Sequence, residues 1–193
     1  MIVCAGEMES FNFATPVGIG LIDVSMQLTK LCVEKKPDFL LFIGSAGSYG
    51  NIDLFEIIES TSACNVENSF LEGRSYTPID NVVTTHPNFE AINRDDLFND
   101  VYVSRETLVN SSNYITSDSH YSKQYVSQGI ELENMEFYAV LKVAQKFGIP
   151  AGGVFVVTNY CDEKAHETFK MNHREAMIKL TDYMNLKNRE LSD

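Results

Sequence analysis

Basic residues are scarce in this sequence, and their scarcity excludes one class of partner. The 193 residues include 15 lysines and arginines against 27 aspartates and glutamates, so the formal net charge is -12. A chain of this charge repels nucleic-acid phosphates and anionic membrane surfaces unless its cations are clustered, and the sequence has no such cluster. We therefore expect neither a nucleic-acid nor a membrane partner.

Cysteine pairs and long apolar runs are also missing. The four cysteines lie far apart and form no Cys-x-x-Cys pair, which argues against both a zinc site and a disulfide framework. No apolar run reaches the roughly 18 residues of a transmembrane helix, and the first residues lack a signal-peptide pattern. These absences predict a cytoplasmic protein with reduced thiols, no metal and no cofactor.

What is present is the composition of a folded domain. Hydrophobic residues make up 44% and charged residues 22% of the chain, close to the averages for soluble globular proteins. A chain of this length buries roughly 70% of the surface that its unfolded form exposes, which is enough to enclose an enzyme pocket. We predict a single domain over residues 1–193.

Short apolar runs alternate with helical patterns along most of the chain. The apolar runs predict strands at residues 1–6, 11–20, 38–47, 54–64, 100–109 and 151–159, of which the first two form a hairpin. Apolar spacings of three and four predict helices at 21–34, 134–147 and 169–184, whereas residues 71–100 form a polar surface excursion. This alternation predicts a three-layer α/β/α fold with helices on both faces of a twisted, mixed and mostly parallel sheet.

Three segments carry glycine or polar residues just beyond the carboxyl ends of strands, where such folds bind ligands. "GSAGSYG" (44–50) has three glycines that allow the backbone to approach a ligand closely, although a tight turn would also use them. "VVTNYCDE" (156–163) places Asn159 and Asp162 after a buried strand. Asn can donate and accept at once, which suits a heterocycle, but a helix cap or turn is the alternative.

The third segment, "ENMEFYAV" (133–140), sets Glu136 beside Met135 at the start of a helix. A glutamate there is often only a favourable helix start, because the helix dipole stabilises a negative charge. A carboxylate can, however, accept hydrogen bonds from two adjacent sugar hydroxyls, while methionine packs on the flat face of a ring. This segment is therefore a candidate sugar site.

In combination, these segments resemble the nucleoside phosphorylase and nucleosidase superfamily, which includes purine nucleoside phosphorylase, uridine phosphorylase and methylthioadenosine nucleosidase. The resemblance is carried by "GIG" before a helix, "KPDFLLFIGSAGSYG" and "ENMEFYAV...FGIPAGGVFVVTNYCDE", in the family's order over most of residues 14–184. It implies a nucleoside phosphorylase-like fold and a small-molecule nucleoside as the ligand.

The resemblance also assigns substrate contacts. The glycine loop corresponds to the family's Gly-Ser-Ala-Gly loop beside the ribose, and the Met-Glu pair to the one whose carboxylate holds the ribose 2' and 3' hydroxyls. A tyrosine in "SSNYIT" lies near the place of an aromatic under the purine. The residues so assigned are Ser45, Ala46, Gly47, Tyr114, Met135 and Glu136.

The catalytic positions depart from the family pattern. Many bacterial members have Ser-Asp where this chain has Thr158-Asn159, and that Asp protonates the leaving purine. Asn159 cannot be a general acid, but it can hold a 6-oxopurine, as a Thr-Asn pair is thought to do in trimeric purine phosphorylases. Asp162 resembles a second acidic position and is a candidate substitute acid. In nucleosidases an N-terminal glutamate activates water, and Glu7, or alternatively Glu9, is expected in that role.

The phosphate-binding positions depart as well. The phosphorylases use an arginine just before the glycine loop, where this chain has Phe42, and another in an N-terminal Gly-Asp-Pro segment that is missing here. We expect Ser45 and Arg105 to bind phosphate, with Arg74 or an arginine of a partner subunit as alternatives.

The sequence thus leaves three functions open. The first is phosphorolysis of 6-oxopurine nucleosides by a homo-oligomeric glycosyltransferase of purine salvage, with inorganic phosphate as co-substrate. The second is hydrolysis of the methylthioadenosine or futalosine type, which the missing arginines favour. The third is nucleoside binding without turnover. The Thr-Asn pair favours the first function, and we place phosphorolysis slightly ahead because Arg105, Arg74 or an arginine of a partner subunit can still reach the anion.

Overall fold

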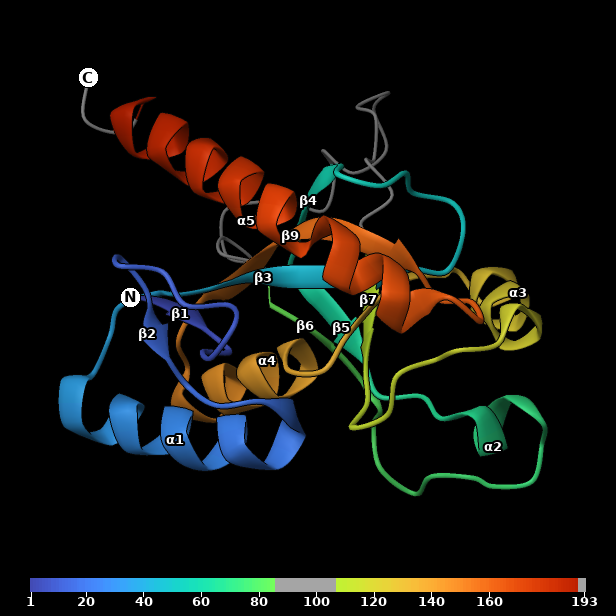
Figure 1. The fold of residues 1–193 in the computed structure, drawn as a ribbon. Helices are drawn as coiled ribbons and strands as arrows, with labels where there is room; N and C mark the ends of the chain where they lie inside the picture. Colours follow the sequence, from blue (N-terminus) through green and yellow to red (C-terminus); the bar gives the residue numbers. More distant parts are fainter. Residues whose placement is uncertain (86–106, 191–193) are drawn as a thin grey trace, which may run out of the picture.

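The computed structural model describes residues 1–85 and 107–190. A nine-stranded sheet forms its centre, and helices cover both faces (Figure 1). The strands are β1 (Ile2–Cys4), β2 (Thr15–Pro16), β3 (Leu40–Ser48), β4 (Ile57–Ser60), β5 (Ser62–Cys64), β6 (Val82–Thr84), β7 (Leu108–Ser111), β8 (Ile130–Asn134) and β9 (Ala151–Tyr160).

Strand β3 holds the sheet together. It pairs in parallel with β1 and β9 and antiparallel with β8, within the order β2-β1-β3-β8-β7-β5-β6. The pairs β1–β2, β5–β7 and β7–β8 are also parallel, whereas β4–β9 and β5–β6 are antiparallel. The sheet is therefore mixed with a majority of parallel pairs, as predicted.

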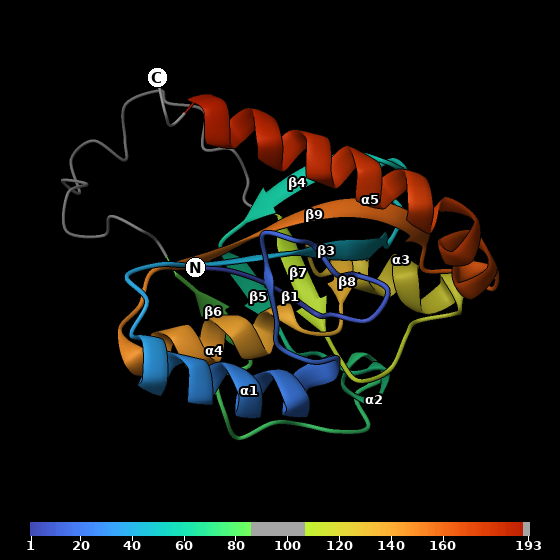
Figure 2. The same cartoon turned by 60° about the vertical axis from the view of Figure 1, so that its left-hand side comes forward.

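The helices divide between the two faces. Helices α1 (Gly20–Lys35) and α4 (Phe137–Phe147) pack together on one face, and the long α5 (Ala165–Glu190) crosses the other, as both ribbon views show (Figures 1 and 2). Two shorter helices, α2 (Asn68–Leu71) and α3 (Ser119–Ser127), lie at one end. None of the helices in the described ranges combines the length and the apolar character needed to span a membrane.

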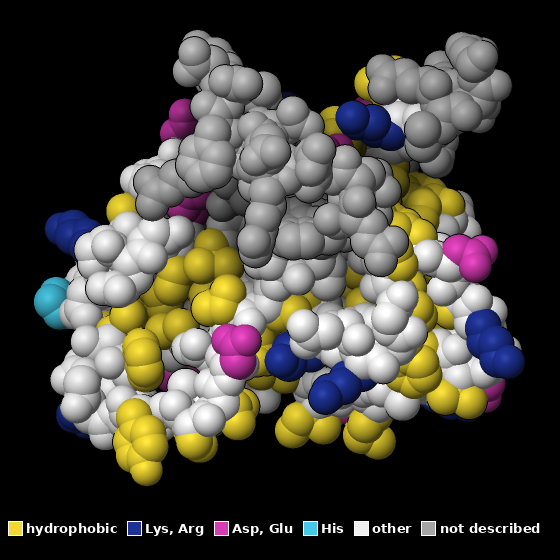
Figure 3. Space-filling view, turned by 180° about the vertical axis from the view of Figure 1, so that it is seen from behind, with side chains coloured by type: hydrophobic (Ala, Val, Ile, Leu, Met, Phe, Trp, Pro, Cys, Tyr) yellow, Lys and Arg dark blue, Asp and Glu magenta, His cyan; other side chains and the backbone are white. Residues whose placement is uncertain are grey.

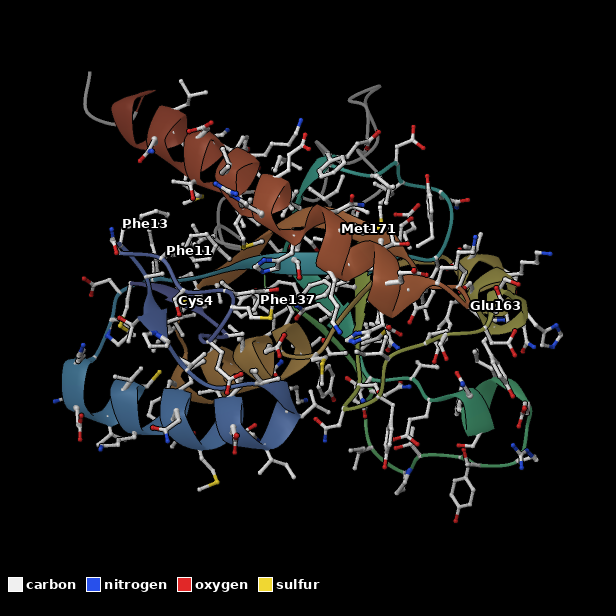
Figure 4. The ribbon with its side chains drawn as sticks, in the orientation of Figure 1. Cys4, Phe11, Phe13, Phe137, Glu163 and Met171 are labelled. Carbon is white, nitrogen blue, oxygen red and sulfur yellow. The ribbon has the colours of Figure 1, made fainter. Side chains whose placement is uncertain are left out.

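The buried apolar side chains of the described residues form three hydrophobic cores, of which the two largest lie between the sheet and the long helices. Successive side chains of a strand point to opposite faces, so Phe42 joins the core under α1 and α4 while Ile43 joins the core under α5. In the first core Phe137 contacts Phe42 and Phe155, with ring centroids 6.3 and 5.0 Å away. Figure 4 shows Phe137 near the centre of the molecule, between α4 and the sheet.

Several predicted elements are confirmed and others are wrong. The strands expected at 38–47 and 151–159 and the helices expected at 21–34 and 134–147 are present. The expected N-terminal hairpin is absent, because the two residues of β2 pair in parallel with β1. The run at 54–64 forms two strands, α5 begins at Ala165, and α3 and β8 were not predicted. Of the strand expected at 100–109, residues 100–106 lie outside the described part.

The first core offers a test of the packing on helix α4. Phe137 is fully buried, whereas Phe147 at the end of the same helix is 41% exposed. We expect Phe137→Ala to lower the free energy of unfolding by about 3–5 kcal/mol, because it leaves a cavity between Phe42 and Phe155. Urea denaturation followed by circular dichroism measures this loss. Phe147→Ala is the matched control and should cost less than about 1 kcal/mol; equal losses would contradict the packing described.

Candidate active site

One cavity collects the three segments that the sequence singled out. Its volume is about 270 Å³, and it lies where the ends of β3 and β9 meet the junction of β8 and α4. The residues lining it are Ala5, Gly6, Glu7, Met8, Glu9, Ile19, Ser45, Ala46, Gly47, Ile115, Glu133, Asn134, Met135, Glu136, Thr158, Asn159, Ala165, His166 and Phe169.

Glu136 is held between the first residues of two helices. It is 4% exposed and immediately precedes α4, and its Oε1 accepts a hydrogen bond from the backbone N–H of Gly20 at 2.9 Å. Gly20 is the first residue of α1, so the positive end of that helix dipole faces the carboxylate. Only glycine fits at this position, because its φ is +80° and a Cβ added there would lie 2.8 Å from Asn113 Oδ1.

The start of α4 is fixed by a second side chain. Asn134 Oδ1 accepts hydrogen bonds from the backbone N–H groups of Glu136 and Phe137 at 2.8 and 2.9 Å, which satisfies two donors at the helix N-terminus. The Nδ2 of Asn134 donates to the carbonyl of Ser45 at 3.0 Å. One asparagine thus ties the Met-Glu segment to the glycine loop.

The pKa of Glu136 reflects its surroundings. Burial raises this pKa to about 7, the hydrogen bond from Gly20 opposes the rise, and the negative charge of Glu9 adds to it. A carboxyl with such a pKa is close to half ionised at neutral pH. Any ligand that donates hydrogen bonds to the ionised form therefore draws the proton away from Glu136.

Glu9 is the N-terminal carboxylate that contacts the glycine loop. Its Oε2 accepts from the backbone N–H of Ser45 at 3.2 Å, and its Oε1 accepts from the Ser45 hydroxyl. A tight turn places it there, because Glu9 donates its N–H to the Gly6 carbonyl at 2.9 Å and Gly6 has a φ of +99°. Glu7 lies in the same turn and also lines the cavity, but it is exposed.

The amide of Asn159, which also lines the cavity, is held in one orientation. Its Oδ1 accepts from Thr158 Oγ1 at 2.9 Å, and its Nδ2 donates to the Tyr160 carbonyl at 3.0 Å. An amide has two N–H bonds and two acceptor lone pairs, so one of each remains for a ligand. The register of β3 against β9 shifts here, so that Gly47 pairs with Asn159 and Thr158 is the extra residue of a bulge.

Only glycine fits at position 47. A Cβ there would lie 2.7 Å from Cys161 Sγ and 3.1 Å from Asn159 Nδ2. The missing side chain makes room for both groups beside β3.

Glu133 is a further buried carboxyl of the cavity wall, and the sequence did not single it out. Its Oε2 accepts from the Tyr49 hydroxyl at 2.8 Å, and its Oε1 accepts from the Thr116 N–H at 2.9 Å. Burial raises the pKa of Glu133, and the hydrogen bonds from Thr116 oppose the rise. This carboxyl connects β8, the end of β3 and the loop after β7.

The remaining predicted residues that the structure describes lie outside the cavity lining. Tyr114 is 76% exposed and does not line the cavity, where its neighbour Ile115 lies instead. Asp162 is also outside the lining, and its Oδ1 accepts from the Lys164 N–H at 2.8 Å at the start of α5. Arg105 falls outside the described residues. Arg74 is at the surface in an ion pair with Glu72.

The sequence was compared with models of known protein families. A model of the phosphorylase superfamily matches residues 2–185. The chain belongs to this superfamily. The resemblance noted in the sequence is thereby confirmed at the level of the family.

Solved structures agree in fold. A mutant Helicobacter pylori methylthioadenosine nucleosidase with 5'-methylthioadenosine in its active site is 17% identical, covers 98% of this chain and 97% of its own, and has a TM-score of 0.76. Futalosine hydrolase of H. pylori is 16% identical over 98% and 96% of the two chains, also with a TM-score of 0.76. The Streptococcus pyogenes S-adenosylhomocysteine nucleosidase gives 15% identity, 95% and 92% coverage and a TM-score of 0.72. No curated protein matches the sequence.

The raised pKa of Glu136 predicts how stability depends on pH. The folded protein binds this proton up to about pH 7, whereas an unfolded glutamate releases it near its usual pKa of 4.5. Folding stability from this group is therefore full below about pH 4.5 and is lost as the pH rises to 7, by at most about 3 kcal/mol. Glu136→Gln removes the titrating group and should lose less stability over this window.

Urea denaturation of parent and Glu136→Gln at about pH 5 and about pH 8 measures the difference. The glutamine oxygen still accepts from Gly20, so the fold is retained. An identical pH dependence of the two proteins would show that Glu136 does not carry the buried proton.

Proposed function

We propose that this member of the phosphorylase superfamily cleaves the N-glycosidic bond of nucleosides by hydrolysis. The observation that carries the proposal is the position of Glu9, whose carboxylate accepts both donors of Ser45 at the glycine loop. A general base there would take a proton from water as the water attacks the anomeric carbon. The similar structures named above are nucleosidases and a hydrolase, which supports the same chemistry.

Each wall of the cavity has a role in this reaction. Glu136 accepts hydrogen bonds from the ribose 2' and 3' hydroxyls, and Met135 packs against the sugar. Asn159 binds the 6-carbonyl of an oxopurine with its amide N–H and a ring N–H with its free lone pair. The carboxylates stabilise the positive charge that develops on the ribose in the transition state.

Phosphorolysis, which the sequence placed slightly ahead, is the second candidate. The Thr158-Asn159 pair remains its support. Against it, Ser45 uses both its N–H and its hydroxyl on Glu9, so the residue expected to bind phosphate faces a carboxylate instead. No lysine or arginine is found among the described residues that line the cavity. An anion would therefore be repelled where the phosphate has to bind.

Release of free base from inosine, measured with and without inorganic phosphate, separates the candidates. Hydrolysis predicts the same rate in both conditions and free ribose as the second product. Adenosine, assayed in parallel, should react more slowly by roughly 5- to 150-fold, because its amino group leaves the Asn159 N–H unpaired. A rate that depends on phosphate would show that the enzyme is a phosphorylase. If no nucleoside is cleaved, binding without turnover is the function that remains.

The proposed base gives a second test. Glu9→Gln keeps the size of the side chain but cannot accept a proton, so hydrolysis should slow by about 10²–10⁴-fold while KM changes little. Glu163→Gln is the matched control, since this carboxylate lies outside the cavity and accepts from the hydroxyl of Ser119, the first residue of α3 (Figure 4). Full activity of Glu9→Gln would remove Glu9 from the mechanism.

The homo-oligomeric state, the cytoplasmic location and a role in purine salvage remain predictions. Light scattering at micromolar concentration measures the first.

A further inference from the structure

We infer that Asn134 is a positioning residue, which holds the two carboxylates of the proposed reaction, Glu9 and Glu136, in a fixed relation to each other. The inference deepens the proposed function and rests on it for the roles of these two carboxylates. Its basis is a continuous chain of hydrogen bonds, in which Asn134 joins the part that holds Glu9 to the part that holds Glu136.

On one side the chain of hydrogen bonds leads to Glu9. The Nδ2 of Asn134 donates to the Ser45 carbonyl at 3.0 Å. The N–H of the same serine donates to Glu9 Oε2 at 3.2 Å, and its hydroxyl donates to Glu9 Oε1. A displacement of Ser45 therefore moves the partner of both oxygens of Glu9. Asn134 thus fixes the place of Ser45, and Ser45 fixes the place of the proposed base.

On the other side the same side chain fixes Glu136. Its Oδ1 accepts from the N–H groups of Glu136 and Phe137 at 2.8 and 2.9 Å, which sets the start of α4. The carboxylate of Glu136 reaches from there to the N–H of Gly20 at 2.9 Å. Burial raises the pKa of Glu136 to about 7, and the side chain of Asn134 is among the groups that oppose this rise. The amide therefore favours both the position and the ionised form of Glu136.

The place of Asn134 in the sheet explains why a side chain makes this connection. Strand β8 pairs antiparallel with β3 as far as Glu133 opposite Gly47, and Asn134 is the last residue of β8. Beyond this point the backbone turns into α4. The side chain of Asn134 adds one hydrogen bond to β3 beyond the last backbone pair, and so it joins the glycine loop to the helix.

Asparagine meets two requirements that other helix-capping residues do not. Aspartate and serine cap helices about as well. Aspartate, however, has no donor for the Ser45 carbonyl, and the hydroxyl of a serine lies one bond closer to the backbone than Nδ2 does. A neutral side chain also suits the charge, because the described cavity lining has four glutamates and no lysine or arginine. The outer face in Figure 3, in contrast, carries basic as well as acidic side chains.

The first test is a double-mutant cycle on the hydrolysis of inosine. Asn134→Ser keeps a cap for α4 but loses the bond to Ser45, so kcat should fall by about 10- to 100-fold. In the Glu9→Gln background the same substitution should cost at most about threefold, because the base that it misplaces is already missing. Asp118→Ser is the matched control and should leave kcat unchanged, since Asp118 caps α3 from outside the cavity.

The second test needs no substrate. The stability that Glu136 contributes by binding a proton in the folded state is lost as the pH rises through its folded pKa. Asn134→Ser removes a group that lowers this pKa, and Asn134→Asp also adds a negative charge, so both raise it further. Urea denaturation at about pH 5 and about pH 9 should therefore show the smallest loss of stability in the parent and the largest in Asn134→Asp.

The two tests keep this inference separate from the proposed function. If no nucleoside is cleaved, the proposed function fails, whereas the pH dependence of unfolding still decides whether Asn134 controls Glu136. A role of Asn134 in folding alone predicts equal fold-losses of kcat in the parent and Glu9→Gln backgrounds. It also predicts the same pH dependence of unfolding in all three proteins. Either result would overturn the inference.

Discussion

The parallel pairing of β3 with β9 is the constraint on which the site depends. The two strands run side by side from Leu40 with Ala151 to Ser48 with Tyr160, and so their carboxyl ends reach the same edge of the sheet. The bulge at Thr158 then changes the register by one residue and sets Asn159 opposite Gly47. The rest of the cavity, including the turn that carries Glu9 and the junction before α4, is arranged around this edge.

The fold concentrates negative charge at a place where burial makes charge costly. Desolvation opposes ionisation of Glu136, and nearby Glu9 opposes it further. The compensation consists of neutral dipoles, namely the first N–H of α1 and the cap that Asn134 provides for α4. If packing alone mattered, an apolar side chain would occupy the position of Glu136. The buried carboxylate therefore lowers the stability of the folded protein, and a bound ligand can offset this loss.

Local sequence patterns identified the parts of the site that depend on local geometry. Gly47 and Asn159 lie near the carboxyl ends of recognisable strands, Glu136 precedes a recognisable helix, and the structure brings all three to one cavity. The choice between Glu7 and Glu9 could not be made, because it depends on the positive φ of the turn at Gly6.

Glu133 was missed for a different reason. The sequence predicts a helix from residue 134 and no strand before it, whereas Glu133 belongs to β8, and its partner Tyr49 lies 84 residues away along the chain. Contacts of that kind are set by the sheet order, which periodicity does not reveal. The stacking of Tyr49 on Tyr125, with ring centroids 4.3 Å apart, likewise joins segments that are distant in sequence.

The reactivity of the Cys161 thiol depends on whether the carboxyl ends of β3 and β9 stay packed together. Its Sγ fills the space over Gly47, it is 1% exposed, and burial raises the pKa of the thiol well above its usual value. A thiol in this state is shielded from alkylating reagents, because reaction requires both access and the thiolate. The rate at which Cys161 is alkylated therefore reports how often the end of β9 separates from β3, that is, the local opening of the structure at the cavity.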